Sequence, residues 1–166
     1  MNLEKSRINI LIKFMKVFIE NEAGSDQKNL YNEKTLEFKK IITVSRKYPY
    51  PYGFILNTTG GDGDNVDCFI ITNKVLKSGQ IVECEPVGLM EQIETAWDPA
   101  KNNIDEEDNN ILAVIRGEKV EIDKNVKEKL SEFILHVFDH VPNKKNRVGN
   151  FLDRDNALQY IKKYKD

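Results

Sequence analysis

The hydrophobic residues of this chain occur in short runs separated by polar turns, a pattern typical of a mainly β protein. For residues 8–20 a strand over 16–20 is expected, with one helix across the whole run as the competing interpretation. Polar, acidic residues 94–110 are interpreted as solvated surface. Further strands are predicted over 53–56, 66–72, 81–90 and 111–115, with a hairpin within 30–44. Many short strands at this spacing favour a closed β-barrel.

Two helices are predicted near the C-terminus. Apolar residues recur with a helical period from Val126 to Val141, which indicates an amphipathic helix. His136 and His140 would lie one turn apart on it, as in a helical metal pair, but without a clear third ligand packing or surface roles are favoured. Asp155 is expected to cap a final short helix.

Length and composition indicate an ordinary soluble protein. The 166 residues suit one domain over 1–166, and a net charge of −2 argues against nucleic-acid binding. Cys68 and Cys84 lie in apolar surroundings, which indicates reduced thiols, with a hidden redox pair as the alternative. The apolar run 8–19 is too short and too charged to span a membrane, so a cytoplasmic location is expected.

A glycine-rich turn delivers three carboxylates into the start of an apolar strand. Asp62 and Asp64 flank Gly63, and Asp67 opens the strand. Three acids this close need a cation if they are buried, and oxygen-only donors indicate Mg²⁺ or Mn²⁺ rather than Zn²⁺. A solvated acidic turn is the alternative. An EF-hand is excluded because, counting from Asp62, Asp67 stands at the glycine position and Asn73 at the final glutamate position.

The surrounding motifs resemble the soluble family I inorganic pyrophosphatases. Residues 48–54 read Tyr-Pro-x-x-Tyr-Gly-Phe, and Asp-Gly-Asp-x-x-Asp follows at 62–67. The likeness continues through Ser78-Gly79 and Glu85-Pro86-Val87-Gly88. It implies an α+β, mainly β fold, a small closed OB-like β-barrel with two C-terminal helices. It further implies Mg²⁺-dependent hydrolysis of inorganic pyrophosphate to two orthophosphates by a metal-activated water, and a homo-oligomer.

The resemblance also implies roles for individual residues. Asp64 matches the aspartate that accepts the proton of the nucleophilic water, and Tyr52 matches a tyrosine near the site, although a core tyrosine is the alternative. Lys28 and Lys40 match phosphate-binding positions. An insertion near 97–105 leaves surface charge as the alternative for Asp108. The matches to metal-binding acids are Asp62, Asp67, Glu94, Asp108 and Glu20.

Several expected phosphate contacts are absent. Leu30 stands where a glutamate is expected, Lys40 where an arginine is expected, and Asn110 where a lysine is expected. Val141-Pro142 replaces a Tyr-Lys pair. Four basic residues could restore positive charge, namely Lys144, Lys145, Arg147 and Arg46. Pyrophosphate hydrolysis is therefore the first hypothesis, beside hydrolysis of another phosphoanhydride such as a nucleotide or nucleotide conjugate, or a catalytically weak binding protein.

Overall fold

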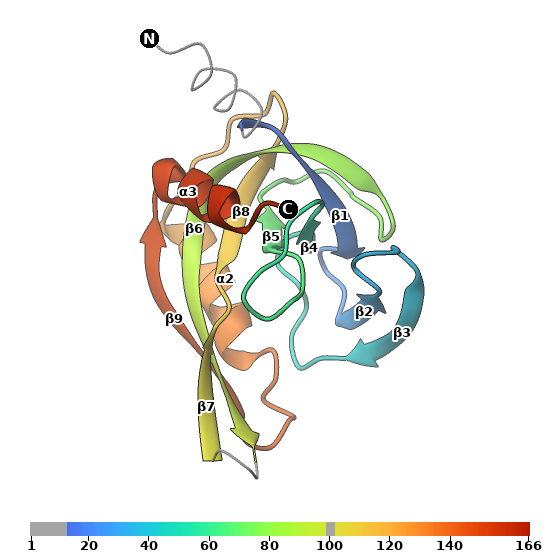
Figure 1. Cartoon of the computed structure of the whole chain (residues 1–166), viewed down its shortest axis with the longest axis vertical. Helices are drawn as coiled ribbons and strands as arrows, with labels where there is room; N and C mark the ends of the chain where they lie inside the picture. The colour runs from blue at the N-terminus through green and yellow to red at the C-terminus, as the bar shows by residue number, and fades with distance from the viewer. Residues whose placement is uncertain (1–12, 99–101) are drawn as a thin grey trace.

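The computed structural model describes residues 13–98 and 102–166 (Figure 1). Within it, five strands pair into a closed ring. β1 pairs with both β4 and β6, β4 continues to β5, and β5 reaches β6 through β8. The strands are β1 (Met15–Asn21), β4 (Tyr52–Ile55), β5 (Asp67–Ile70), β6 (Ile81–Asp98) and β8 (Asn110–Ile115). The predicted closed barrel is confirmed, and residues 15–20 form a strand rather than a helix.

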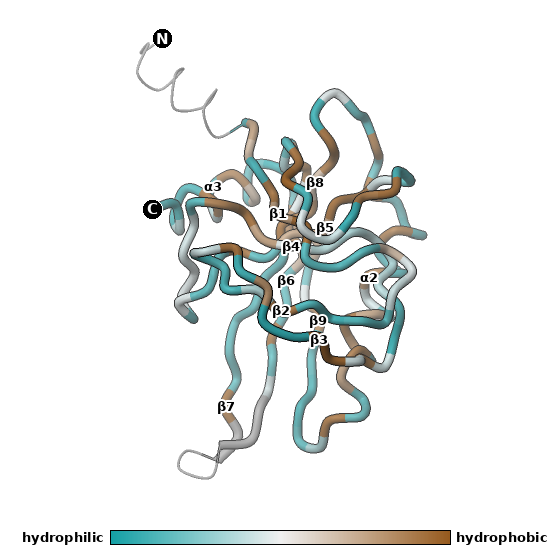
Figure 2. The backbone as a smooth tube through the Cα atoms, turned by 90° about the vertical axis from the view of Figure 1, so that its right-hand side faces the viewer, coloured by the Kyte–Doolittle hydropathy of each residue, from teal (hydrophilic) through white to brown (hydrophobic). Residues whose placement is uncertain are grey.

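Two additions extend the barrel. β2 (Gln27–Tyr31) and β3 (Phe38–Thr43) form a separate hairpin beside it. The far half of β6 leaves the ring and pairs with β7 (Asn102–Glu107) on one side and β9 (Lys144–Leu152) on the other. In Figure 1 this part extends away from the barrel, and Figure 2 shows that its strands are mostly hydrophilic.

The alternation of side chains along the strands divides the core in two. Val17, Cys68, Ile70 and Ile111 belong to one buried cluster inside the ring, which also receives Ala157 from the last helix. The intervening residues point outward into a second cluster, which packs under the longer helix. Its members include Tyr48, Phe69, Met90, Leu112, Leu130 and Phe133. Both cysteines are free and buried, as expected.

The two C-terminal helices are present with shifted ends. α2 (Lys124–His136) begins after Asp123, whose carboxylate accepts the backbone N–H of Val126 at 2.9 Å. The helix ends at His136, so the prediction that it runs to Val141 was wrong at its C-terminus. α3 (Arg154–Tyr164) is capped by Asp153 rather than by Asp155, because Asp153 accepts the N–H of Asn156.

The acidic run at 105–107 is exposed, as expected for solvated surface, but residues 94–98 and 102–107 form paired strands that the sequence analysis did not predict. β6 continues to Asp98, and β7 lies beside it with Glu94 opposite Glu106 and Thr95 opposite Asp105. A polar ribbon of this kind has no hydrophobic alternation from which sequence could predict it. The part of the 8–20 run before residue 13 lies outside the described residues. Over residues 13–98 and 102–166, no helix is long and apolar enough to cross a membrane.

Candidate active site

The acidic motif forms a tight turn that leads into β5. Gly63 has a φ of 87°, which suits glycine, and Asp62 Oδ1 accepts the backbone N–H of Asp64 at 3.0 Å. Asp62 and Asp64 are exposed, whereas Asp67 at the start of β5 is partly buried. The motif therefore presents two carboxylates from a solvent-facing turn and one from the root of the strand.

The β2–β3 turn clamps the base of this acidic turn. Lys34 Nζ donates to the carbonyl oxygen of Thr58 at 3.0 Å, to Thr59 Oγ1 at 2.9 Å and to Asn65 Oδ1 at 2.6 Å. Glu33 Oε1 accepts the backbone N–H of Asn65 at 3.1 Å. The clamp fixes the residues on both sides of Asp62 and Asp64. Neither Glu33 nor Lys34 was singled out from the sequence, because they lie in a polar turn without a motif.

Asp67 and Asp108 come together because β5 and β8 run parallel. Asp67 lies opposite Asn110 in this pairing, and Asp108 lies two residues before the start of β8. The two carboxyl groups are therefore close enough to influence each other's pKa. Burial and the neighbouring Asp108 raise the pKa of Asp67 well above its usual range. Burial also raises the pKa of Asp108.

Glu20 and Glu33 add further negative charge. Glu20, on β1, is 6% exposed, and burial together with Glu33 and Asp64 raises its pKa to about 8 although Lys28 acts in the opposite direction. Burial and the nearby Asp64 and Asp62 raise the pKa of Glu33 to about 7. Carboxylates from five segments of the chain therefore influence one another within one site, which is how a site built for cations differs from a solvated acidic turn.

The Tyr-Pro-x-x-Tyr-Gly segment packs against the base of the site. The pKa of Tyr52 is raised well above its usual value by burial, by Asp67 and by Glu20. Tyr52 packs on Tyr48 and Phe69 with ring centroids 5.5 Å and 4.9 Å apart. Gly53 is required because a Cβ there would lie 1.8 Å from the carbonyl oxygen of Phe18 on β1.

Two lysines approach the aromatic ring of Phe138. Lys28 Nζ lies 5.2 Å from the centre of the Phe138 ring, and Lys144 Nζ lies 3.7 Å from the same centre. Lys144 also forms an ion pair of 3.0 Å with Glu94. Lys28 and Glu94 both influence the pKa of Asp108, so these residues share one neighbourhood. Glu94 therefore lies near Asp108, and its role as a metal ligand stays a prediction.

The other basic candidates lie elsewhere. Arg147 pairs with Asp105 at 2.8 Å on the polar ribbon, and Arg46 pairs with Glu132 of α2 at 3.0 Å. Lys40 is exposed on β3 opposite Leu30, and its role in phosphate binding stays a prediction. The positions of the missing contacts are filled by non-basic groups, and Asn110 donates to Gln92 Oε1 at 2.6 Å.

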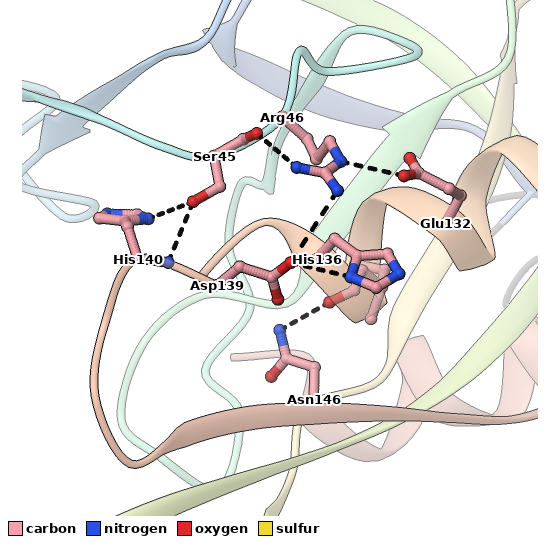
Figure 3. A network of polar contacts seen from close by, with 8 residues as sticks. Ser45, Arg46, Glu132, His136, Asp139, His140 and Asn146 are labelled. Carbon is pink, nitrogen blue, oxygen red and sulfur yellow. Dashed lines mark hydrogen bonds and ion pairs between the residues drawn. The ribbon is translucent and has the colours of Figure 1, made fainter.

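The two histidines do not form a metal pair. Because α2 ends at His136, His140 lies in the following turns and makes a hydrogen bond to Ser45 Oγ through Nδ1 (Figure 3). His136 Nδ1 contacts Asp139 Oδ2 at 2.9 Å instead. Figure 3 shows the two imidazoles engaged by different partners at the junction between α2 and the segment after β3.

The donor set fits a hard divalent cation. In the described part of the chain, no three Asp, Glu, His or Cys side chains converge closely enough to hold an ion as they stand. Mg²⁺, however, keeps several waters and typically takes only one or two carboxylates together with substrate phosphates. The partly buried Asp67 and Asp108 offer such a pair, since two neighbouring carboxylates that repel each other are stabilised by a cation between them.

Comparison with known proteins agrees with this geometry. The sequence model of the family described as inorganic pyrophosphatase matches residues 17–166. The inorganic pyrophosphatase of Saccharolobus solfataricus is 30% identical over 89% of this chain and 87% of its own length. That of Nanoarchaeum equitans is 31% identical over 87% of this chain and 91% of its own length.

Solved structures share the fold. The inorganic pyrophosphatase of Neisseria gonorrhoeae superposes with a TM-score of 0.79 at 21% identity, covering 93% of this chain and 91% of that one. The enzyme from Coxiella burnetii gives 0.77 at 23% identity, covering 92% and 94%. The mainly β, OB-like fold expected from the sequence is confirmed, and the chain belongs to the inorganic pyrophosphatase family.

Proposed function

We propose that this chain hydrolyses inorganic pyrophosphate to two orthophosphates with the help of divalent ions, Mg²⁺ first and Mn²⁺ as a substitute. The observation that carries the proposal is the electrostatic coupling among acids of the site: burial and neighbouring carboxylates raise the pKa of Glu20, of Asp67 and of Asp108. Such a cluster is stabilised by cations and not by folding alone. Family membership supplies the substrate class.

Each side chain has a definite task in this proposal. The ions would be held by five acids, namely Asp62, Asp67, Asp108, Glu94 and Glu20. Asp67 is central among them, because both Asp108 and Glu20 raise its pKa. Bound divalent ions neutralise phosphate oxygens and bring the pKa of water toward neutrality. Asp64, on the exposed side of the turn, takes the proton of the attacking water. Lys28 faces the phosphates, and Tyr52 packs beneath the acids.

The chain is proposed to act as one domain over 1–166, to self-associate as a homo-oligomer, and to work in the cytoplasm without membrane or nucleic-acid partners. The net charge of −2 supports the last point, since binding to polyanionic nucleic acid relies on a basic face.

One assay tests the function. The purified protein is incubated with Mg²⁺ and either pyrophosphate or a panel of nucleotides, and phosphate release is measured. We expect rapid release from pyrophosphate, little release from nucleotides, and loss of release in Asp64→Asn. Release from nucleotides alone would replace the proposed substrate, and no release from any of them would leave the chain as a binding protein.

A further inference from the structure

The phosphate-binding side of the site lacks positive charge at two places where the resemblance expects a lysine, at Asn110 and at Val141-Pro142. Val141 and Pro142 carry no charge, and the amide of Asn110 is committed to Gln92. A polyanionic substrate entering beside so many carboxylates requires cationic side chains as well as metal ions. Lys28 is one such side chain, and the structure identifies a second.

The turn after α2 positions Lys144 beside Glu94. Lys144 is the first residue of β9, and Asn143 before it has a φ of 63°, a conformation that asparagine tolerates better than most residues. β9 pairs with β6 so that Lys144 lies opposite Ala96 and Asn146 lies opposite Glu94. Lys144 and Glu94 are therefore diagonal neighbours on one face of the ribbon. The 3.0 Å ion pair follows from this register.

The ammonium group of Lys144 has a second anchor. It lies 3.7 Å from the centre of the Phe138 ring, which Lys28 also approaches to 5.2 Å. A cation over an aromatic face is attracted by the ring and stays positioned without a carboxylate partner. The Lys144 and Glu94 side chains are 28% and 27% exposed, so the pair is accessible to ions and substrate.

We propose that Lys144 is a phosphate-binding residue of this chain, held by Glu94 until a divalent ion takes that carboxylate. The inference rests on the proposed function, in which Glu94 is a metal ligand. A carboxylate bound to a divalent cation attracts an ammonium group far less, because most of its charge is neutralised. The released Lys144 stays over Phe138 beside Lys28, where its charge faces the phosphates. Lys144 and the metal ion thus compete for Glu94.

A merely structural ion pair would behave differently. A partly exposed pair of this kind contributes only about 0–1 kcal/mol to stability. Its removal would change neither metal affinity nor the KM for pyrophosphate. These two quantities therefore separate the functional role from the structural one.

The experiment compares Lys144→Met with Lys145→Met. Lys145 is the adjacent, exposed residue opposite Thr95, and strand alternation turns its side chain to the other face. Both changes remove one positive charge from the same strand. Calorimetry with Mg²⁺ alone measures metal affinity, and steady-state assays give the KM for pyrophosphate.

We expect Lys144→Met to bind Mg²⁺ about threefold more tightly, because a competing cation is gone. Its KM for pyrophosphate should rise about tenfold, the loss of one charged hydrogen bond. Lys145→Met should stay near wild type in both, and Lys144→Arg should recover part of the KM. Equal behaviour of Lys144→Met and Lys145→Met in both measurements would overturn the inference.

Failure of the proposed function has a different signature. Wild-type protein that releases no phosphate from pyrophosphate would reject the function, while calorimetry still decides the role of Lys144. The probe is then inorganic phosphate added to Mg²⁺-loaded protein. Weaker phosphate binding by Lys144→Met than by Lys145→Met supports the inference, and equal binding overturns it.

Discussion

Replacing Glu20 by Gln should stabilise the metal-free protein at alkaline pH. The pKa of Glu20 is raised from 4.5 to about 8 by burial and by its acidic neighbours. The folded state therefore holds a proton that the unfolded state releases, so stability falls as pH rises from about 4.5 to about 8. At 1.36 kcal/mol per pKa unit the full penalty above pH 8 is at most about 5 kcal/mol, and we expect Glu20→Gln to recover about 2–5 kcal/mol.

Urea unfolding followed by circular dichroism, in EDTA at pH 5 and pH 8.5, measures this effect. The free energy of unfolding of Glu20→Gln should be clearly higher than that of wild type at pH 8.5 and only slightly higher at pH 5. Glu121→Gln, a change at an exposed glutamate after β8, is the matched control and should follow wild type. If the free energy of unfolding of Glu20→Gln depends on pH as that of wild type does, ionisation of Glu20 does not destabilise the folded state.

Three further predictions concern the acids and their support. Asp64→Asn should slow phosphate release by about 10²–10⁴-fold while Mg²⁺ affinity in calorimetry stays close to wild type, and a parallel loss of affinity would contradict a proton-accepting role. Asp67→Ala should weaken Mg²⁺ binding more than Asp108→Ala does, because the negative charges of Glu20 and Glu33 also act on Asp67. Equal Mg²⁺ affinities of the two variants would show the ligand assignment to be wrong. Lys34→Met should lower the free energy of unfolding by about 1–3 kcal/mol, because the buried Asn65 and Thr58 lose a charged donor, whereas Lys39→Met at an exposed position should not; similar unfolding curves would exclude the clamp.

Local sequence was sufficient for the acidic turn and for most of the barrel. A few neighbouring residues determine the local structure at three places: the turn at Gly63, the apolar run after Asp67 and the alternating hairpin. The resemblance of the surrounding motifs then supplied the roles of residues that lie far apart, such as Glu20 and Asp108. Both influence the pKa of Asp67, and their approach to it depends on the closed ring and on the parallel β5–β8 pairing.

The parts that sequence did not predict are those whose stability comes from pairing with distant strands. β9 reads Lys-Lys-Asn-Arg-Val-Gly-Asn-Phe-Leu, which has little apolar alternation, and it is a strand because β6 lies beside it. The pairing of Lys144 with Glu94 follows from that register. The sequence alone did not show which of four basic residues restores positive charge to the site. Glu33 and Lys34 were missed for the same reason, since their partners lie about thirty residues away on the acidic turn.

Anomalous diffraction from crystals soaked in Mn²⁺ tests the central claim most directly. We expect peaks beside Asp67 and Asp108, with Asp62 turned toward the same ions. Crystals in abundant Mn²⁺ that show no peak there, with Asp62 and Asp64 directed into solvent and no ion between Asp67 and Asp108, would contradict the assignment of this cluster as a metal site.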